Sequence, residues 1–247
     1  SFDIFKSKST QLLESLKSSD TTLFKASSMA LKGYEFEKSD IPQIITTLKA
    51  NFIDDTLEYG NTRFWIYNRL YALMDSVQKI DFIKNNYNSM PDSGITRMDA
   101  LGELVNIQSK ESIDLWKTLI IAAASKSGKK TPLYGTIGSM GYDSLPLISS
   151  LYPDLAKLLD NEDFKEVYYS ISANALKHKL ITTNTYSYLK DKIFSDARAE
   201  YKRMNEHASG QDAYYSPYFS DALYMLNLLP ASEHVLQLNS EVIADTV

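Results

Sequence analysis

The chain has no cysteine and little glycine or proline. The absence of cysteine from its 247 residues excludes disulfides and thiolate metal sites. It has nine glycines and seven prolines, whereas average usage is about 7% glycine and 5% proline. Turn residues are therefore scarce, and long regular elements are expected.

Long apolar runs and an excess of basic residues are also missing. No stretch approaches the roughly 20 apolar residues that a membrane-spanning helix needs. The net charge of −5 is opposite in sign to that of the basic surfaces that bind nucleic-acid phosphates. We therefore expect no nucleic-acid partner and no membrane insertion. With 44% hydrophobic and 23% charged residues, the chain has the composition of an ordinary globular protein.

The spacing of apolar residues is helical. The clearest amphipathic segment has an apolar face of Tyr186, Leu189, Ile193, Ala197, Tyr201 and Met204. Its opposite, solvent-facing side is expected to hold Lys190, Lys192, Asp196, Arg198, Lys202 and Arg203. The only brief alternation of apolar and polar residues, at 33–37, is too short to seed a sheet. The predicted fold class is therefore all-α.

An Ala-Leu pair recurs in segments with helical spacing. The pairs begin at Ala30, Ala72, Ala100, Ala175 and Ala222, at intervals of 42, 28, 75 and 47 residues. Two-helix solenoid repeats are about 34 to 47 residues long, and a small residue lets two helices approach closely. The pattern predicts irregular antiparallel helical hairpins, stacked as a HEAT- or TPR-like α-solenoid.

We expect one all-helical domain over residues 1–247. The main break in the helical pattern runs from Ser125 to Tyr142 and carries four of the nine glycines. It would divide the domain into an N-terminal half, 1–126, and a C-terminal half, 142–247. Because the chain begins at Ser1 rather than Met, we expect it to be an excised domain or a processed product.

No set of reactive residues is apparent in the sequence. Residues 125–131 read Ser-Lys-Ser-Gly-Lys-Lys-Thr, but Ala123 stands where a phosphate-binding loop needs its first glycine. His178, His207 and His234 lie too far apart for a local metal pair. The acidic residues 160–163 lack the alternating pattern of a calcium loop and are better explained as helix capping by Asn161. The sequence therefore predicts no catalytic, metal or cofactor site.

One aromatic segment is a candidate for binding a partner. Tyr214, Tyr215, Tyr218 and Phe219 surround Ser216-Pro217 in a polar loop. Exposed aromatic side chains on a loop can anchor a protein partner. In the alternative interpretation, Tyr218 and Phe219 pack beneath the following helix while the other two cap it.

The C-terminal half carries a distinctive residue pattern over about residues 140–205. Its parts are Tyr142-Asp143-Ser144-Leu145, Leu151-Tyr152-Pro153-Asp154-Leu155, Phe164-Lys165-Glu166 and Ala197-Arg198-Ala199-Glu200-Tyr201. This pattern resembles a helical region that is joined to long bacterial proteins carrying a TraB/GumN-type domain. It implies an accessory region of a larger secreted or envelope-associated protein. The Gly-x-x-His and Gly-x-x-Asn motifs of the TraB/GumN domain are missing here, so its peptidase-like activity is not implied.

These observations favour a non-catalytic helical-repeat domain that acts as a scaffold. Its expected partner is a protein, a peptide or a flanking domain of the same polypeptide, and no cofactor is expected. The alternative is a helical enzyme or small-molecule binder whose site forms only in three dimensions, from residues distant in the sequence.

Overall fold

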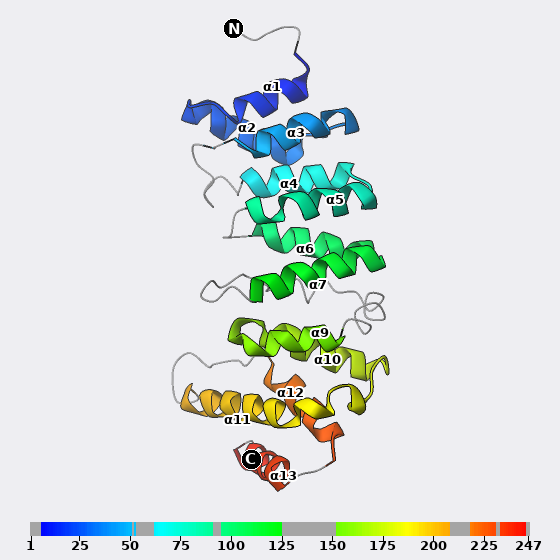
Figure 1. Ribbon diagram of the computed structural model, residues 1–247. Helices are drawn as coiled ribbons and strands as arrows, with labels where there is room; N and C mark the ends of the chain where they lie inside the picture. Colours follow the sequence, from blue (N-terminus) through cyan, green and yellow to red (C-terminus); the bar gives the residue numbers. More distant parts are fainter. Residues whose placement is uncertain are drawn as a thin grey trace. The chain divides into compact units, whose positions relative to one another are not determined.

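The computed structural model describes residues 6–50, 52, 62–90, 95–124, 152–207, 218–230 and 233–245. Within these ranges every regular element is a helix and no strand occurs, which confirms the all-α prediction (Figure 1). The chain separates into two compact units, Ser1–Ile107 and Gln108–Val247. The boundary thus lies before the break expected at Ser125–Tyr142, which falls outside the described residues, and each unit is described by itself below.

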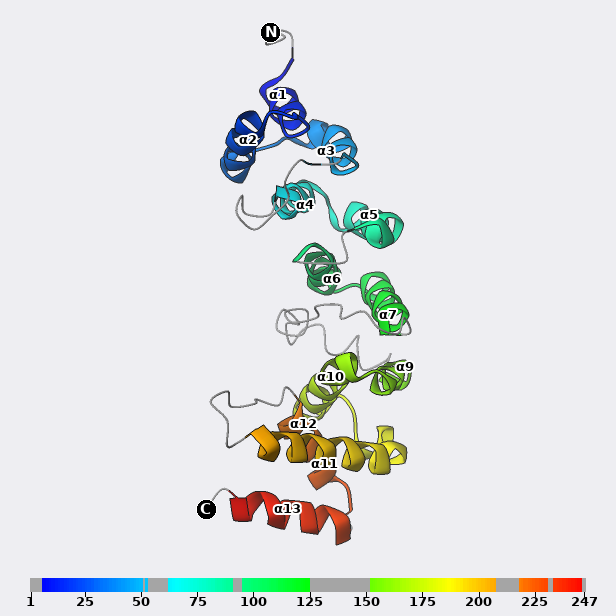
Figure 2. The same cartoon turned by 90° about the vertical axis from the view of Figure 1, so that its left-hand side faces the viewer.

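Unit 1 is built from consecutive short helices. They are α1 (Lys8–Ser15), α2 (Thr21–Gly33), α3 (Ile41–Leu48), α4 (Thr62–Leu73), α5 (Ser76–Asn86) and α6 (Ile95–Ile107). The 3-10 turns η1 (Lys38–Asp40) and η3 (Tyr87–Ser89) precede α3 and follow α5. Helix α1 packs against α2 and α3, α4 packs against α2, α3 and α6, and α5 packs against α6 (Figure 2).

Side-chain caps fix several helix starts in unit 1. The Asp20 carboxylate accepts hydrogen bonds from the backbone N–H groups of Thr22 and Leu23, at 2.8 and 3.2 Å. Asp75 and Gln78 form a reciprocal capping box at the start of α5. Such caps satisfy N–H groups that have no partner within the helix, and each stabilises a helix by about 1 kcal/mol.

An aromatic cluster joins α4 to α5. The ring centroids of Tyr67, Tyr71 and Phe82 lie 6.1 to 6.2 Å from one another. Such tilted and edge-on pairs suit the quadrupoles of the rings and add to the burial of apolar area. The buried Tyr71 hydroxyl has no hydrogen-bond partner among the described residues. The cluster therefore holds three large side chains in a fixed arrangement between two helices.

A half-buried carboxylate on α6 gives unit 1 a pH-dependent stability. Burial and the nearby Glu103 raise the pKa of Asp99 to about 6, above the value of about 3.9 in an unfolded chain. The folded state therefore holds the proton more tightly. The stability from Asp99 is fully present below pH about 4 and is lost as the pH rises through 6.

We expect Asp99→Asn to stabilise unit 1 at pH 8 and to leave it almost unchanged at pH 4, because asparagine mimics the protonated acid. Urea unfolding at both pH values measures this difference. The matched control is Asp81→Asn, because Asp81 is an exposed aspartate on α5. An equal gain at both pH values, or an equal gain in the control, would contradict the prediction.

Unit 2 contains α7 (Lys110–Ala124), α9 (Tyr152–Leu155), α10 (Lys165–Lys177), α11 (Lys190–His207), α12 (Phe219–Leu228) and α13 (Glu233–Asp245). Between them lie the short 3-10 turns η5 (Ala156–Asp160), η6 (Glu162–Phe164), η7 (Thr183–Thr185) and η8 (Ser187–Leu189). Helix α7 packs against η5, α10 packs against η5, η6 and α12, and α11 packs against α12. Ser109 caps the start of α7, because its hydroxyl accepts a hydrogen bond from the Ser112 N–H at 3.1 Å.

The Ala-Leu pattern was partly correct as a marker of helix contacts. Ala100, Ala175 and Ala222 are buried, as expected for small residues at close helix contacts. Ala30 and Ala72 are exposed, so for these two the expectation is wrong. The dipeptide cannot show which side of its helix faces a neighbour, because that depends on residues far away in the sequence.

Candidate functional site on helix α11

Helix α11 has the amphipathic spacing predicted from the sequence. Ile193, Ala197 and Tyr201 are buried, and α11 packs against α12. The prediction that Asp196 faces solvent is wrong: its exposed fraction is 4%, and that of Glu200 is 0%. Burying a carboxylate is costly unless it is paired and hydrogen-bonded, so the partners of these two acids define the site.

Lys165 at the start of α10 is the partner of Asp196. Its ammonium donates to Asp196 Oδ1 at 2.8 Å and to Glu162 Oε2 at 2.5 Å. The Tyr169 hydroxyl donates to the other oxygen of Asp196 at 2.8 Å. Lys192, one turn before Asp196, lies 3.4 Å from Oδ1. Both carboxylate oxygens of Asp196 are therefore engaged by α10.

Arg203 and Tyr218 complete the network. The Arg203 guanidinium lies 2.7 Å from Glu162 Oε1 and 3.1 Å from Glu200 Oε2. The Tyr218 hydroxyl lies 3.3 Å from the same two carboxylate oxygens. Charged and hydrogen-bonded groups from η6, α10, α11 and the residue before α12 thus meet at one place. We call Glu162, Lys165, Tyr169, Asp196, Glu200, Arg203 and Tyr218 the ionic network.

Four groups of the ionic network have shifted pKa values, and each shift moves the pKa further from pH 7. Burial opposes the charge of Lys165, but hydrogen bonds to Asp196 and Glu162 outweigh it and raise the lysine pKa. Burial likewise opposes ionisation of Glu162, but Lys165 and Arg203 lower its pKa. Burial and neighbouring carboxylates raise the pKa values of Tyr169 and Tyr218 well above 10. General acid–base catalysis favours a pKa near the working pH, so these four groups are suited to holding helices rather than to transferring protons.

Two aromatic stacks fix the same region. The rings of Tyr169 and Tyr218 are 5.1 Å apart and inclined by 17°, and those of Tyr201 and Phe219 are 5.7 Å apart and inclined by 22°. The first stack links α10 to the residue preceding α12, and the second links α11 to the first turn of α12. Together with the ionic network, the stacks hold α11 in place.

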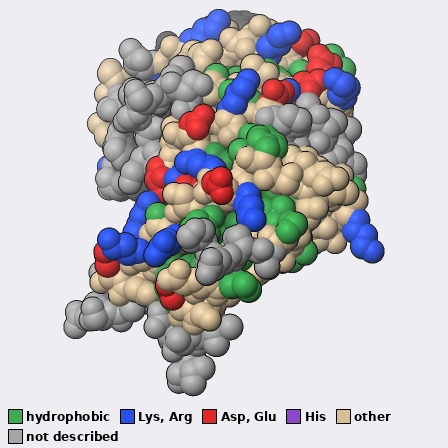
Figure 3. Space-filling model, turned by 60° about the horizontal axis from the view of Figure 1, so that its bottom comes forward, with side chains coloured by type: hydrophobic (Ala, Val, Ile, Leu, Met, Phe, Trp, Pro, Cys, Tyr) green, Lys and Arg blue, Asp and Glu red, His purple; other side chains and the backbone are tan. Residues whose placement is uncertain are grey.

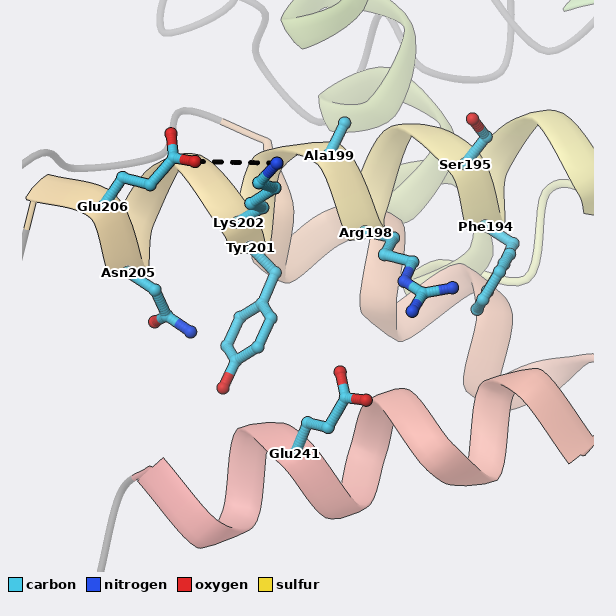
Figure 4. Close-up of a pocket in the computed structure, with 9 residues that line it drawn as sticks. All are labelled: Phe194, Ser195, Arg198, Ala199, Tyr201, Lys202, Asn205, Glu206 and Glu241. Atoms are coloured by element: carbon cyan, nitrogen blue, oxygen red, sulfur yellow. Dashed lines mark ion pairs between the residues drawn. The ribbon is translucent and has the colours of Figure 1, made fainter.

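A groove of about 790 Å³ lies between α11 and α13. Phe194, Arg198, Tyr201 and Asn205 project from α11 toward α13, and Glu241 projects from α13 into the space between them (Figure 4). Ser195, Ala199, Lys202 and Glu206 also line it, and in Figure 4 Ser195, Ala199 and Glu206 point away from α13. This volume lies within the usual range of ligand pockets, about 300–1,000 Å³. The space-filling view shows hydrophobic, basic and acidic side chains interspersed on the described surface of unit 2 that faces the viewer (Figure 3).

Some charged side chains around the groove have an ion-pair or hydrogen-bond partner, and Arg198 has no ion-pair partner among the described residues. Lys202 lies 3.7 Å from Glu206 along α11, and Glu241 accepts a hydrogen bond from Gln237 at 3.0 Å. Arg198 is exposed and forms no ion pair with any described residue. The groove therefore offers an apolar floor of Phe194 and Tyr201, an available guanidinium on one wall and a carboxylate on the other.

The aromatic residues singled out in the sequence divide into two pairs. Tyr214 and Tyr215 lie outside the described residues, so their role in binding a partner stays a prediction. Tyr218 and Phe219 are 3% and 8% exposed. They pack internally, as the alternative interpretation of the sequence has it, and do not present an aromatic surface to a partner.

Within the described ranges, the other sequence candidates do not converge on a reactive site. Residues 125–131 and the side chains of His207 and His234 lie outside the described parts of the chain, and His178 is exposed. Helix α10 begins at Lys165, later than expected, and the Glu162 carboxylate belongs to the ionic network. Across the described ranges, no group of three or more His, Asp or Glu side chains is placed to hold a metal ion.

The sequence did not identify the groove or the ionic network. Phe194, Arg198, Tyr201 and Asn205 recur at intervals of four, three and four residues, which is one stripe of a helix. That spacing could have indicated a second functional face on α11. No local signal links Lys165 to Asp196, because they are 31 residues apart.

Comparisons with known proteins give no match: no family model, curated protein or solved structure is similar enough to this chain to establish a relationship. Among the helices described, none combines the length and apolar character needed to cross a membrane.

Proposed function

We propose that this chain is a helical-repeat interaction domain that binds a segment of a protein partner in the groove between α11 and α13. In this proposal the helices form hairpins stacked as an irregular HEAT- or TPR-like α-solenoid. The packing within unit 1 supports the stacking, because α1, α2 and α4 each contact the helix two further along the chain. Solenoids use surfaces between successive helices to bind extended partners.

The observation that carries the proposal is the combination of an open groove with a firmly held wall. Tyr201 lines the groove and stacks on Phe219, while the ionic network fixes the other side of α11. A wall that is already ordered loses little conformational entropy on binding, so more of the contact energy appears as affinity. Exposed Leu236 on α13 and Leu228 at the end of α12, 58% and 43% exposed, extend the apolar surface of unit 2.

The groove predicts the chemistry of the partner. Phe194 and Tyr201 favour apolar side chains, and Arg198 favours an acidic side chain that can accept two parallel hydrogen bonds. Glu241, on the opposite wall, favours a hydrogen-bond donor. Asn205 lies eleven positions after Phe194 on α11, a rise of roughly 16 Å along the helix. We therefore expect a peptide segment of about three helical turns with an acidic residue beside an apolar stripe.

Site-specific photo-crosslinking tests the proposed function. A photoreactive phenylalanine derivative at Asn205 in the groove is expected to capture a protein from an extract of the source cells, and the same group at Lys38 in unit 1 is not. The captured protein is then purified and its affinity for the wild-type chain is measured. Arg198→Glu is expected to weaken that affinity about tenfold or more, as for a central arginine in an interface.

Lys38→Glu makes the same charge change at an exposed site in unit 1 and is expected to leave the affinity unchanged. If the purified partner binds Arg198→Glu as tightly as the wild type, the groove is not its site. If crosslinking at Asn205 captures nothing beyond what Lys38 captures, the proposed function fails.

We further propose that the domain is an accessory region of a larger polypeptide that is exported or associated with the cell envelope. Only the residue pattern over about residues 140–205 supports this, through its resemblance to regions joined to TraB/GumN-type domains. In this role the groove would position a partner or a neighbouring domain. Localisation of the complete gene product by cell fractionation tests this, and recovery in the cytosol alone would contradict it.

A further inference from the structure

A separate cavity of about 550 Å³ opens in unit 1 between α3, α4 and α5. The elements surrounding it are visible in Figure 2. Leu48, Tyr67 and Phe82 give it apolar and aromatic walls, and Lys49, Arg63 and Asn86 give it polar ones. Its volume falls in the range of pockets for small organic ligands, about 300–1,000 Å³.

Both charged side chains among the described lining residues of the cavity are cations. Lys49 and Arg63 line it, and no carboxylate stands among its described lining residues, although the whole chain has a net charge of −5. The C-terminal carbonyl groups of α3 would repel an anion. Arg63 offsets this repulsion, because its two terminal nitrogens donate to the carbonyl oxygens of Leu48 and Ala50 at 2.8 and 2.9 Å. The local electrostatics therefore favour an anionic ligand.

A tyrosine hydroxyl in the cavity wall is available to that ligand. Tyr67 is only 5% exposed, and its ring is held by Tyr71 and Phe82. Its hydroxyl forms no hydrogen bond with any described residue. Burial raises the pKa of Tyr67 despite the opposing effect of Arg63, so the hydroxyl keeps its proton and can donate.

We propose that this cavity binds a small organic acid, with its carboxylate near Lys49 and the Tyr67 hydroxyl and its apolar or aromatic body against Leu48 and Phe82. The Tyr67 hydroxyl donates to a carboxylate oxygen, and the ammonium of Lys49 at the rim neutralises the charge. This site is independent of the groove between α11 and α13, and each proposal can fail without the other.

Isothermal titration of the full chain with three matched probes tests the assignment. The probes are 4-phenylbutyrate, its neutral amide and the cationic 4-phenylbutylamine, which share one apolar body. We expect the acid to bind at least about fivefold more tightly than the amide, as one charge-assisted hydrogen bond provides, and the amine to bind most weakly. Equal affinities for the acid and the amide would overturn the proposal.

Two variants locate the binding. Tyr67→Phe is expected to weaken 4-phenylbutyrate binding about fivefold without lowering the melting temperature, since the hydroxyl has no internal partner to lose. Lys49→Glu is expected to weaken it about fivefold as well. Lys84→Glu, the same charge change at an exposed position of α5 outside the cavity, is expected to leave binding unchanged. An equal loss in Lys84→Glu, or full affinity in Tyr67→Phe, would overturn the assignment to this cavity.

Discussion

Replacing Asp196 by alanine is expected to destabilise unit 2 by about 3 to 5 kcal/mol, the usual cost of breaking a buried ion pair. The variant leaves the Lys165 ammonium, in a side chain only 10% exposed, with the half-exposed Glu162 as its remaining acidic partner. It also removes the acceptor of the Tyr169 hydroxyl. Urea unfolding in a Trp65→Phe background measures the loss, because Trp116 in unit 2 is then the only tryptophan.

The control for this prediction is a triple variant that removes Asp196 together with its two buried partners on α10, Lys165 and Tyr169. Lys165→Met, Asp196→Leu and Tyr169→Phe together replace the three buried partners by apolar side chains of similar size, while Glu162 keeps its ion pair with Arg203. Since no buried charge or hydroxyl is then left unpaired, this triple variant is expected to recover most of the stability lost in Asp196→Ala. A loss below about 1 kcal/mol in Asp196→Ala would mean that the pair behaves as a solvated surface ion pair.

Replacing Trp116 by alanine is expected to destabilise unit 2 by about 3 to 5 kcal/mol, the range for truncating a large core side chain. Trp116 lies on α7 and is fully buried. Its indole N–H has no hydrogen-bond partner among the described residues, so Trp116→Phe removes an unsatisfied donor as well as some volume. We therefore expect Trp116→Phe to cost clearly less than Trp116→Ala.

Hydrogen exchange followed by mass spectrometry separates local from global effects. In Trp116→Ala, protection is expected to fall first in α7 and in η5, against which α7 packs, while α1 to α6 keep theirs. Equal losses in Trp116→Ala and Trp116→Phe would show that the indole nitrogen is satisfied in solution. Loss of protection throughout α1 to α6 would show that the two units unfold together.

Much of the local structure could be predicted from the sequence. The spacing of Ile193, Ala197 and Tyr201 gave the buried side of α11. Such signals are local, because a helix repeats every 3.6 residues and its caps lie within one turn of its ends. Trp65 on α4 is only half-buried, whereas Trp116 on α7 is fully buried, since the depth of a side chain depends on which helix covers it.

By itself, the sequence determined that this chain is helical, acidic and free of thiol chemistry, because composition and periodicity depend only on residues and their near neighbours. Only the tertiary structure decided that Asp196 is buried, since its partner Lys165 lies 31 residues away on another helix. The groove on α11 and the cation-lined cavity beside Tyr67 were likewise decided only by the tertiary structure. Each requires side chains from different helices to meet, and local spacing carries no information about that encounter.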